Sequence, residues 1–280
     1  MDRLTKGLIK GLAPAVFSAG ILFPLFPGFA GAQPVEVLWL GQSATRITTV
    51  TGKVIVIDPF LKKNPKTPAK YKDLAALGKV DLILLTHGHG DHVGDTVALA
   101  KLTGAKVALN ADLGRTFASL GWLGYKQMIR FNKSGSIKPL GEGITITMVS
   151  AEHSSEVRVK GPEKGQETIH PGGEPGGYII ELENGFTVYH AGDTGVFGDM
   201  AFIGEYYKPD LTLLPIGGHF TMDPAHAAYA AKFLLKSKAV IPIHYGTFPP
   251  LKGTPAQFKA ALGSSSVKVL DVAPGQAVTF

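Results

Sequence analysis

The sequence of this 280-residue chain predicts a layered α/β fold in one domain. Short apolar segments of strand length alternate with segments whose apolar residues recur at helical spacing. The 35 glycines and 19 prolines indicate many turns rather than a helical bundle. With 45% hydrophobic and 18% charged residues, the composition is that of a globular chain with a sizeable core.

The first half of the chain is predicted to be rich in strands. A proline follows the third of them, in Asp58-Pro59, and stops its ladder of hydrogen bonds. Residues 61–72 are rich in lysine and proline and are expected to form a surface loop. The expected strands are residues 35–40, 45–50, 53–57, 82–85, 106–109, 127–131 and 144–150, and the expected helices are residues 73–77, 93–102 and 112–120.

The second half is predicted to contain a hairpin, because Asn184-Gly185 is a strong turn signal between two apolar runs. Residues 154–177 show no periodicity and are rich in glycine, proline, glutamate and lysine, so we expect a long loop that shapes the substrate pocket. The other expected strands are residues 177–183, 185–190, 211–215 and 240–243, with two more at the C-terminus. The expected helices are residues 197–207, 224–235 and 255–262.

A metal-binding motif follows the apolar run at residues 82–85. His87, His89, Asp91 and His92 lie within six residues, separated by glycines that permit a tight turn. Imidazole and carboxylate groups are ligands for zinc, iron and manganese. A helix is expected to begin near Asp91. The motif therefore predicts a metal site at the end of a strand.

Three more candidate ligands follow predicted strands, namely His153, Asp193 and His244. In layered α/β folds, neighbouring strands deliver the residues at their ends to one edge of the sheet. We therefore expect these three side chains to meet the motif at residues 87–92.

Composition excludes several other kinds of site. The chain has no cysteine, so it has neither a thiolate ligand nor a cysteine nucleophile. Ser43, Ser154 and Ser155 lie in no nucleophile elbow, which argues against a serine hydrolase. The net charge of +6 is mild and includes no basic run, so nucleic acid is not indicated as a partner.

Residues 1–32 have the layout of a secretory signal peptide. Basic residues precede an apolar segment that ends in Ala30-Gly31-Ala32. Prolines interrupt that segment, which counts against the alternative of an uncleaved membrane anchor. We predict a periplasmic or secreted protein that begins at Gln33 and keeps no stable membrane association. N-terminal sequencing of the exported protein checks this, and a sequence that starts at Met1 would contradict it.

The order of these motifs resembles that of the metallo-β-lactamase superfamily. His87-x-His89-x-Asp91-His92 is followed by a lone histidine, by Asp193 in Ala-Gly-Asp-Thr, and by His244. Asp58 in Ile-Asp-Pro is similar to the superfamily's first acidic motif. The segments at residues 215–222 and 243–248 resemble its poorly characterised metal-dependent hydrolase branch, to which ascorbate-phosphate lactonases are more distant relatives. The resemblance implies a four-layer αββα sandwich.

The resemblance also implies a ligand set for two divalent metals, with zinc expected and manganese or iron compatible with nitrogen and oxygen ligands. Asp58 would orient a ligand histidine, and turn capping is the alternative role for it. The implied ligands of the first metal are His87, His89 and His153, those of the second are Asp91, His92 and His244, and Asp193 would bridge the two.

The implied reaction is hydrolysis of an ester, lactone or phosphodiester-type small molecule by metal-bound hydroxide. We also place Asp91 and His219 among the catalytic candidates, with His219 as a donor to the oxyanion or the leaving group. His190 is expected to be buried and hydrogen-bonded, and His226 to be solvated. An iron-dependent oxidoreductase and a metallo-phosphodiesterase or nuclease remain alternatives on the same fold. The sequence does not indicate an oligomeric state.

Overall fold

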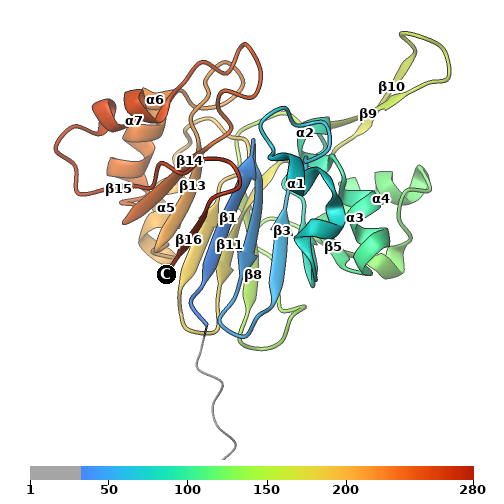
Figure 1. Cartoon of the computed structure of the whole chain (residues 1–280), viewed down its shortest axis with the longest axis horizontal. Coiled ribbons are helices and arrows are strands. Elements are labelled where there is room, and N and C mark those ends of the chain that lie inside the picture. Colours follow the sequence, from blue (N-terminus) through green and yellow to red (C-terminus); the bar gives the residue numbers. More distant parts are fainter. Residues whose placement is uncertain (1–32) are drawn as a thin grey trace, which may run out of the picture. The chain divides into compact units, whose positions relative to one another are not determined.

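Two seven-stranded sheets form the centre of the fold (Figure 1). The computed structural model describes residues 33–280, so the expected signal peptide lies outside the described residues. The first sheet has the order β16-β1-β2-β3-β4-β5-β6 and the second β15-β14-β13-β12-β11-β8-β7. The strands of the first sheet are Ala277–Thr279, Glu36–Gly41, Ala44–Thr48, Val54–Ile57, Leu82–Leu84, Lys106–Asn110 and Met128–Phe131 in that order. Those of the second are Lys268–Val269, Ala239–Ile243, Leu211–Pro215, Thr187–His190, Gly176–Glu181, Thr145–Ser150 and Ser136–Ile137.

Helices cover the outer face of each sheet, which completes the four-layer αββα arrangement implied by the resemblance. The first sheet is covered by α1 (Ala69–Lys72), η1 (Leu74–Leu77), α2 (Gly90–Val93), α3 (Thr96–Thr103), α4 (Ala111–Ser119) and η2 (Tyr125–Gln127). The second is covered by α5 (Met200–Tyr206), α6 (Pro224–Tyr229), η3 (Ala230–Leu234) and α7 (Pro255–Leu262). Within residues 33–280, none of these helices has the length and hydrophobicity needed to span a bilayer.

The core has three layers because side chains alternate along each strand. In β1, Val37 and Trp39 face the second sheet, while Leu38 and Leu40 face the helices. Strands buried on both faces need apolar residues at every position, and β3 (Val54–Ile57) meets that need with Val-Ile-Val-Ile. The strands predicted for the first sheet are confirmed, and most of their ends lie within one or two residues of the predicted positions.

The strands of both sheets bring their ends to one edge. In the first sheet β3 and β4 are parallel, so the residues after them, Asp58 and His87, lie at the same edge. In the second sheet β12, β13 and β14 are parallel, and β8 runs in their direction because both β8 and β12 are antiparallel to β11. Residues that follow β8, β12 and β14 therefore also meet at one edge.

The expectation of a long loop at residues 154–177 is wrong. This segment forms a hairpin of β9 (Glu156–Lys160) and β10 (Glu167–Pro171), paired antiparallel from Glu156↔Pro171 to Lys160↔Glu167. Figure 1 shows that it extends away from the two sheets. Val157 alone of β9 is buried, so most of the hairpin meets water on both faces. The alternation of charged residues with Val157 and Val159 is confined to the five residues of β9, and β10 does not continue it.

Three expected helices have different bounds. Gly94 breaks the expected helix at residues 93–102 into α2 and α3, and the helix expected from residue 197 begins at Met200. The helix expected at residues 224–235 turns π-helical at η3, where the amide of Leu235 donates to the carbonyl of Ala230. The hairpin expected around Asn184-Gly185 is confirmed as β11–β12.

Gly94 is predicted to be essential to the packing of α2 against the loop after β3. Its φ is +40°, and an added Cβ would lie 2.6 Å from the Cα of Phe60 and from the carbonyl oxygen of Pro59. Gly94→Ala should lower the free energy of unfolding by about 3 kcal/mol, from backbone strain and the steric clash together.

The matched control is Gly104→Ala, at the C-terminal end of α3, where φ is +75° and no atom of residues 33–280 lies within 4 Å of an added Cβ. This change should lower stability by about 1 kcal/mol, from strain alone. Chemical denaturation of both variants checks the difference. Equal losses would contradict the close contact at Gly94.

Candidate metal centre

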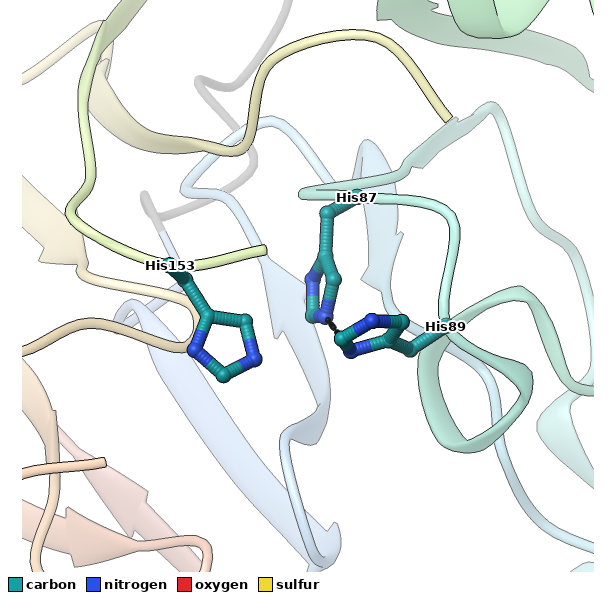
Figure 2. Close-up of side chains that lie close together, drawn as sticks. All are labelled: His87, His89 and His153. Atoms are coloured by element: carbon teal, nitrogen blue, oxygen red, sulfur yellow. Dashed lines mark hydrogen bonds between the residues drawn. The ribbon is translucent and has the colours of Figure 1, made fainter. Parts of the chain in front are cut away.

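Three histidines from two chain segments face one point. His87 follows β4, His89 precedes α2, and His153 follows β8 (Figure 2). The Nε2 of His87 lies 2.9 Å from the Nδ1 of His89, and one ligand nitrogen from each of the three rings lies within 4.8 Å of the other two. Nitrogens grouped in this way match the donor set of a metal ion.

A second group lies directly beside the first. Its members each offer one ligand atom, and these atoms also lie within 4.8 Å of one another; the members are Asp91, His92 and His244. The Oδ2 of Asp193 is 3.3 Å from the Nε2 of His92 and 3.0 Å from the Nε2 of His244. The same oxygen is 3.6 Å from the Nε2 of His153. Asp193 therefore contacts members of both groups, as a bridging ligand would.

Asp58 connects the end of β3 to this cluster. It is fully buried, and its Oδ2 lies 2.7 Å from the Nδ1 of His92. Its two oxygens also accept hydrogen bonds from the amide and the hydroxyl of Thr86, at 2.9 and 2.7 Å. Because the carboxylate accepts the Nδ1 proton of His92, Nε2 faces the cluster and is the ring nitrogen available to a metal. Thr86, which the sequence did not single out, helps to fix this carboxylate.

Gln42 is a further contact that the sequence did not indicate. Its buried side chain donates from Nε2 to the Oδ2 of Asp91 at 2.8 Å. Its carbonyl oxygen accepts from the indole of Trp39 and from the backbone amide of His244. One turn between β1 and β2 thus contacts two members of the second group. Gln42 lies outside the metal-binding motifs of this sequence, so only the pairing of distant segments reveals it.

Part of the backbone strain lies at this edge, where three of the seven non-glycine residues with positive φ among residues 33–280 are found. Gln42, Asp58 and His244 have φ values of 54°, 46° and 54°, which non-glycine residues seldom adopt. Such conformations require support from the surrounding structure and occur most often at functional sites. Three residues that contact the cluster therefore also carry backbone strain.

The buried polar atoms of the cluster fit a metal ion. Among residues 33–280, the Nε2 of His92, both ring nitrogens of His244 and the Oδ1 of Asp193 are buried without a hydrogen-bond partner. Leaving buried polar atoms unpaired is unfavourable, and several of them directed at one point are explained by a cation bound between them. The donors are all nitrogen or oxygen, which suits zinc, manganese and iron.

Electrostatics divides the histidines in the same way. Burial lowers the pKa of His87, His89 and His153, so these rings are neutral at pH 7 and available as ligands. Burial also opposes charge on His244, but Asp193 and Asp91 raise its pKa to about 9. Without a metal, a proton on His244 therefore balances the carboxylates.

An open cavity of about 560 Å³ lies over the cluster. Asp91, His89, His153, Asp193 and His244 all contribute to its lining. Candidate ligands are therefore accessible to a small molecule, which a purely structural metal site does not require.

His219 is placed elsewhere. It lines a second hollow together with Asp223, Pro250 and Lys252, whereas its neighbour Phe220 lines the cavity over the cluster. The structure therefore does not bring His219 to the other candidates, and its catalytic role stays a prediction.

The remaining histidine expectations are testable on the structure. His190 is confirmed as buried and hydrogen-bonded: its Nδ1 accepts from the amide of Gly192 and its Nε2 donates to the carbonyl of Ser43. His226 is confirmed as exposed, on α6. His170 lies on β10 rather than in a loop.

Comparison with known proteins agrees with this architecture. A family model described as "Beta-lactamase superfamily domain" matches residues 53–245. A UPF0173 metal-dependent hydrolase from Cupriavidus taiwanensis is 57% identical, and the match covers 92% of this chain and 91% of that protein. Another from Polaromonas sp. is also 57% identical, over 90% of this chain and 93% of that protein.

A solved structure is similar as well. Igni18, described as a novel metallo hydrolase from the archaeon Ignicoccus hospitalis, is 38% identical with a TM-score of 0.76, and the match covers 89% of this chain and 99% of Igni18. The chain therefore belongs to the metallo-β-lactamase superfamily, which confirms the resemblance seen in its motifs. It is a metal-dependent hydrolase like these relatives.

Metal affinity is predicted to rise with pH up to about 9, because a metal must displace the proton from His244. The pKa of His244 is raised above its ordinary value of 6.5. Protonation of His244 therefore stabilises the metal-free fold fully below pH 6.5, and this stabilisation is lost as the pH rises through about 9. Stabilisation of the fold by bound metal should instead increase as the pH rises, because less free energy is needed to remove the proton from His244. Calorimetric zinc titrations between about pH 6.5 and 8.5 should show tighter binding with proton release, and an affinity independent of pH would contradict this.

Proposed function

We propose that this hydrolase uses a dinuclear metal centre to cleave an ester, lactone or phosphodiester bond of a small molecule. The observation that carries the proposal is the position of Asp193. Its Oδ2 lies within 3.6 Å of histidine nitrogens from both ligand groups, so a single carboxylate can serve two ions. Two adjacent ions can act on both the attacking and the leaving oxygen of a hydrolysis reaction.

The ligands divide into two sets that need no rearrangement of the backbone. The first set is His87, His89 and His153, and the second is Asp91, His92 and His244. Bound ions would lower the pKa of a coordinated water toward about 7 and stabilise negative charge on the substrate. Zinc is the metal we propose, because imidazole and carboxylate ligands without cysteine or methionine suit it well.

The protein's own residues orient this centre. Asp58 holds the ring of His92 through Nδ1, and Gln42 holds the carboxylate of Asp91. Asp91 is only partly buried and also lines the cavity, so we keep it as a catalytic candidate that can contact an entering nucleophile or substrate. The pKa of Asp91 is lowered by His92 and His244 despite its burial, which keeps it ionised.

Export of the protein remains part of the proposal. The support is the sequence of residues 1–32 described above, and the absence of cysteine leaves such a protein independent of the redox state outside the cytoplasm.

His89→Ala is predicted to reduce hydrolysis to the background rate, because it removes a ligand from the first set while leaving the cluster's buried residues in place. The assay uses zinc-loaded protein and a panel of esters, lactones and phosphodiesters, with zinc content measured in parallel. The matched control is His226→Ala, which removes an exposed histidine from α6 and should leave both quantities unchanged. Full activity in His89→Ala would contradict the assignment.

A further inference from the structure

Two aromatic side chains line the cavity beside the metal centre. Phe220 is 58% exposed and Phe248 is 36% exposed, and the buried Leu251 lies in the same lining. Large apolar side chains left open to water beside a reactive centre indicate a surface that a ligand covers.

The loops that carry these rings are tied to the candidate ligands. Phe220 lies in a turn closed by hydrogen bonds from Gly218 to Met222 and from Phe220 to Gly218. Met222 then donates to the carbonyl of Thr194, the residue directly after Asp193. The turn is therefore held at a set position relative to the bridging carboxylate.

Phe248 has a similar attachment to His244. The amide of Leu251 donates to the carbonyl of Phe248, and the amide of Gly246 donates to the carbonyl of Leu251. This turn begins two residues after His244. Both aromatic rings are thus presented by short turns adjoining residues of the metal centre, so a substrate bound there would meet them on entry.

The charges of the cavity argue against an anionic substrate. Among the described residues that line it, Arg158 is the one lysine or arginine. Its guanidinium is already paired with Glu156, with Nη2 and Nε at 2.6 and 2.7 Å from Oε1 of that carboxylate. Away from the metal centre, the lining therefore offers no uncompensated positive charge to a phosphate or carboxylate group.

We propose that the substrate is an uncharged ester or lactone with an aromatic or similarly large apolar group beside the bond that is cleaved, and that Phe220 and Phe248 bind this group. The inference rests on the proposed hydrolytic function and narrows its substrate class. Hydrolysis adds water across the acyl–oxygen bond. An ester gives a carboxylic acid and an alcohol, and a lactone gives a single hydroxy acid. A phosphorylated or otherwise anionic substrate is the class that the cavity disfavours.

The activity test compares three ethyl esters of the same alcohol with zinc-loaded protein, namely ethyl phenylacetate, ethyl acetate and the anionic monoethyl succinate. Phe220 and Phe248 should shield the phenyl group of ethyl phenylacetate from water. This burial should make kcat/KM for ethyl phenylacetate at least about tenfold higher than for ethyl acetate. Phe220→Ala should reduce this ratio several-fold. Phe202→Ala, which removes an aromatic ring of 55% exposure from α5, outside the cavity, should leave the ratio unchanged.

A binding test separates the inference from the hydrolytic function. Calorimetry measures the dissociation constants of benzylphosphonate and methylphosphonate on the zinc-loaded protein, without turnover. Binding of benzylphosphonate should be at least about tenfold tighter, with the advantage lost in Phe220→Ala and retained in Phe202→Ala.

Each outcome decides a different claim. Tighter binding of benzylphosphonate with no cleavage of any ester would support the apolar site and overturn the proposed reaction. Cleavage with equal rates for phenylacetate and acetate, or with a preference for monoethyl succinate, would overturn the substrate class and leave the hydrolase intact. An equal effect of Phe220→Ala and Phe202→Ala would also overturn it.

Discussion

The structure depends on balancing charge at one buried edge. Asp58, Asp193 and His92 are almost fully shielded from water, and Asp91 and His244 lie against them. Carboxylates buried together are tolerated only when cations or hydrogen-bond donors offset them. The raised pKa of His244 shows that the fold attracts positive charge there. A metal ion would supply that charge and would also coordinate ring nitrogens that have no hydrogen-bond partner among residues 33–280.

The fold meets this constraint by joining its two sheets at the strand ends. The hydroxyl of Tyr178, in the second sheet, donates to the carbonyl of Leu85 just before His87. The turn after β1 accepts hydrogen bonds from His244 and His190, which belong to the second sheet, through the carbonyls of Gln42 and Ser43. Hydrogen bonds to backbone carbonyls thus hold the segments that carry the ligands of both sheets, so the centre can be organised before a metal binds.

Much of this could be predicted from the sequence, because the apolar strands and the residues at their ends are local signals. His87, His153 and His244 were expected to meet for that reason, and they do. Contacts between segments that are distant in the chain could not be predicted from the sequence. Gln42 and Thr86 belong to no motif. In the hairpin of β9 and β10, the alternation of apolar and charged residues is confined to the five residues of β9. His219 fits a strand-end pattern, yet the positive φ of the turn at that residue and its place in the second hollow separate it from the cluster.

The central claim is that two ligand groups hold two metal ions through one shared carboxylate. The most direct measurement is the number of zinc ions retained per chain after dialysis, by elemental analysis of the full protein and of two variants. We expect two ions in the wild-type protein and about one in both His153→Ala and His244→Ala, since each change removes a ligand from a different group. A single ion in the wild-type protein, or the loss of all metal in one variant and none in the other, would contradict the dinuclear centre.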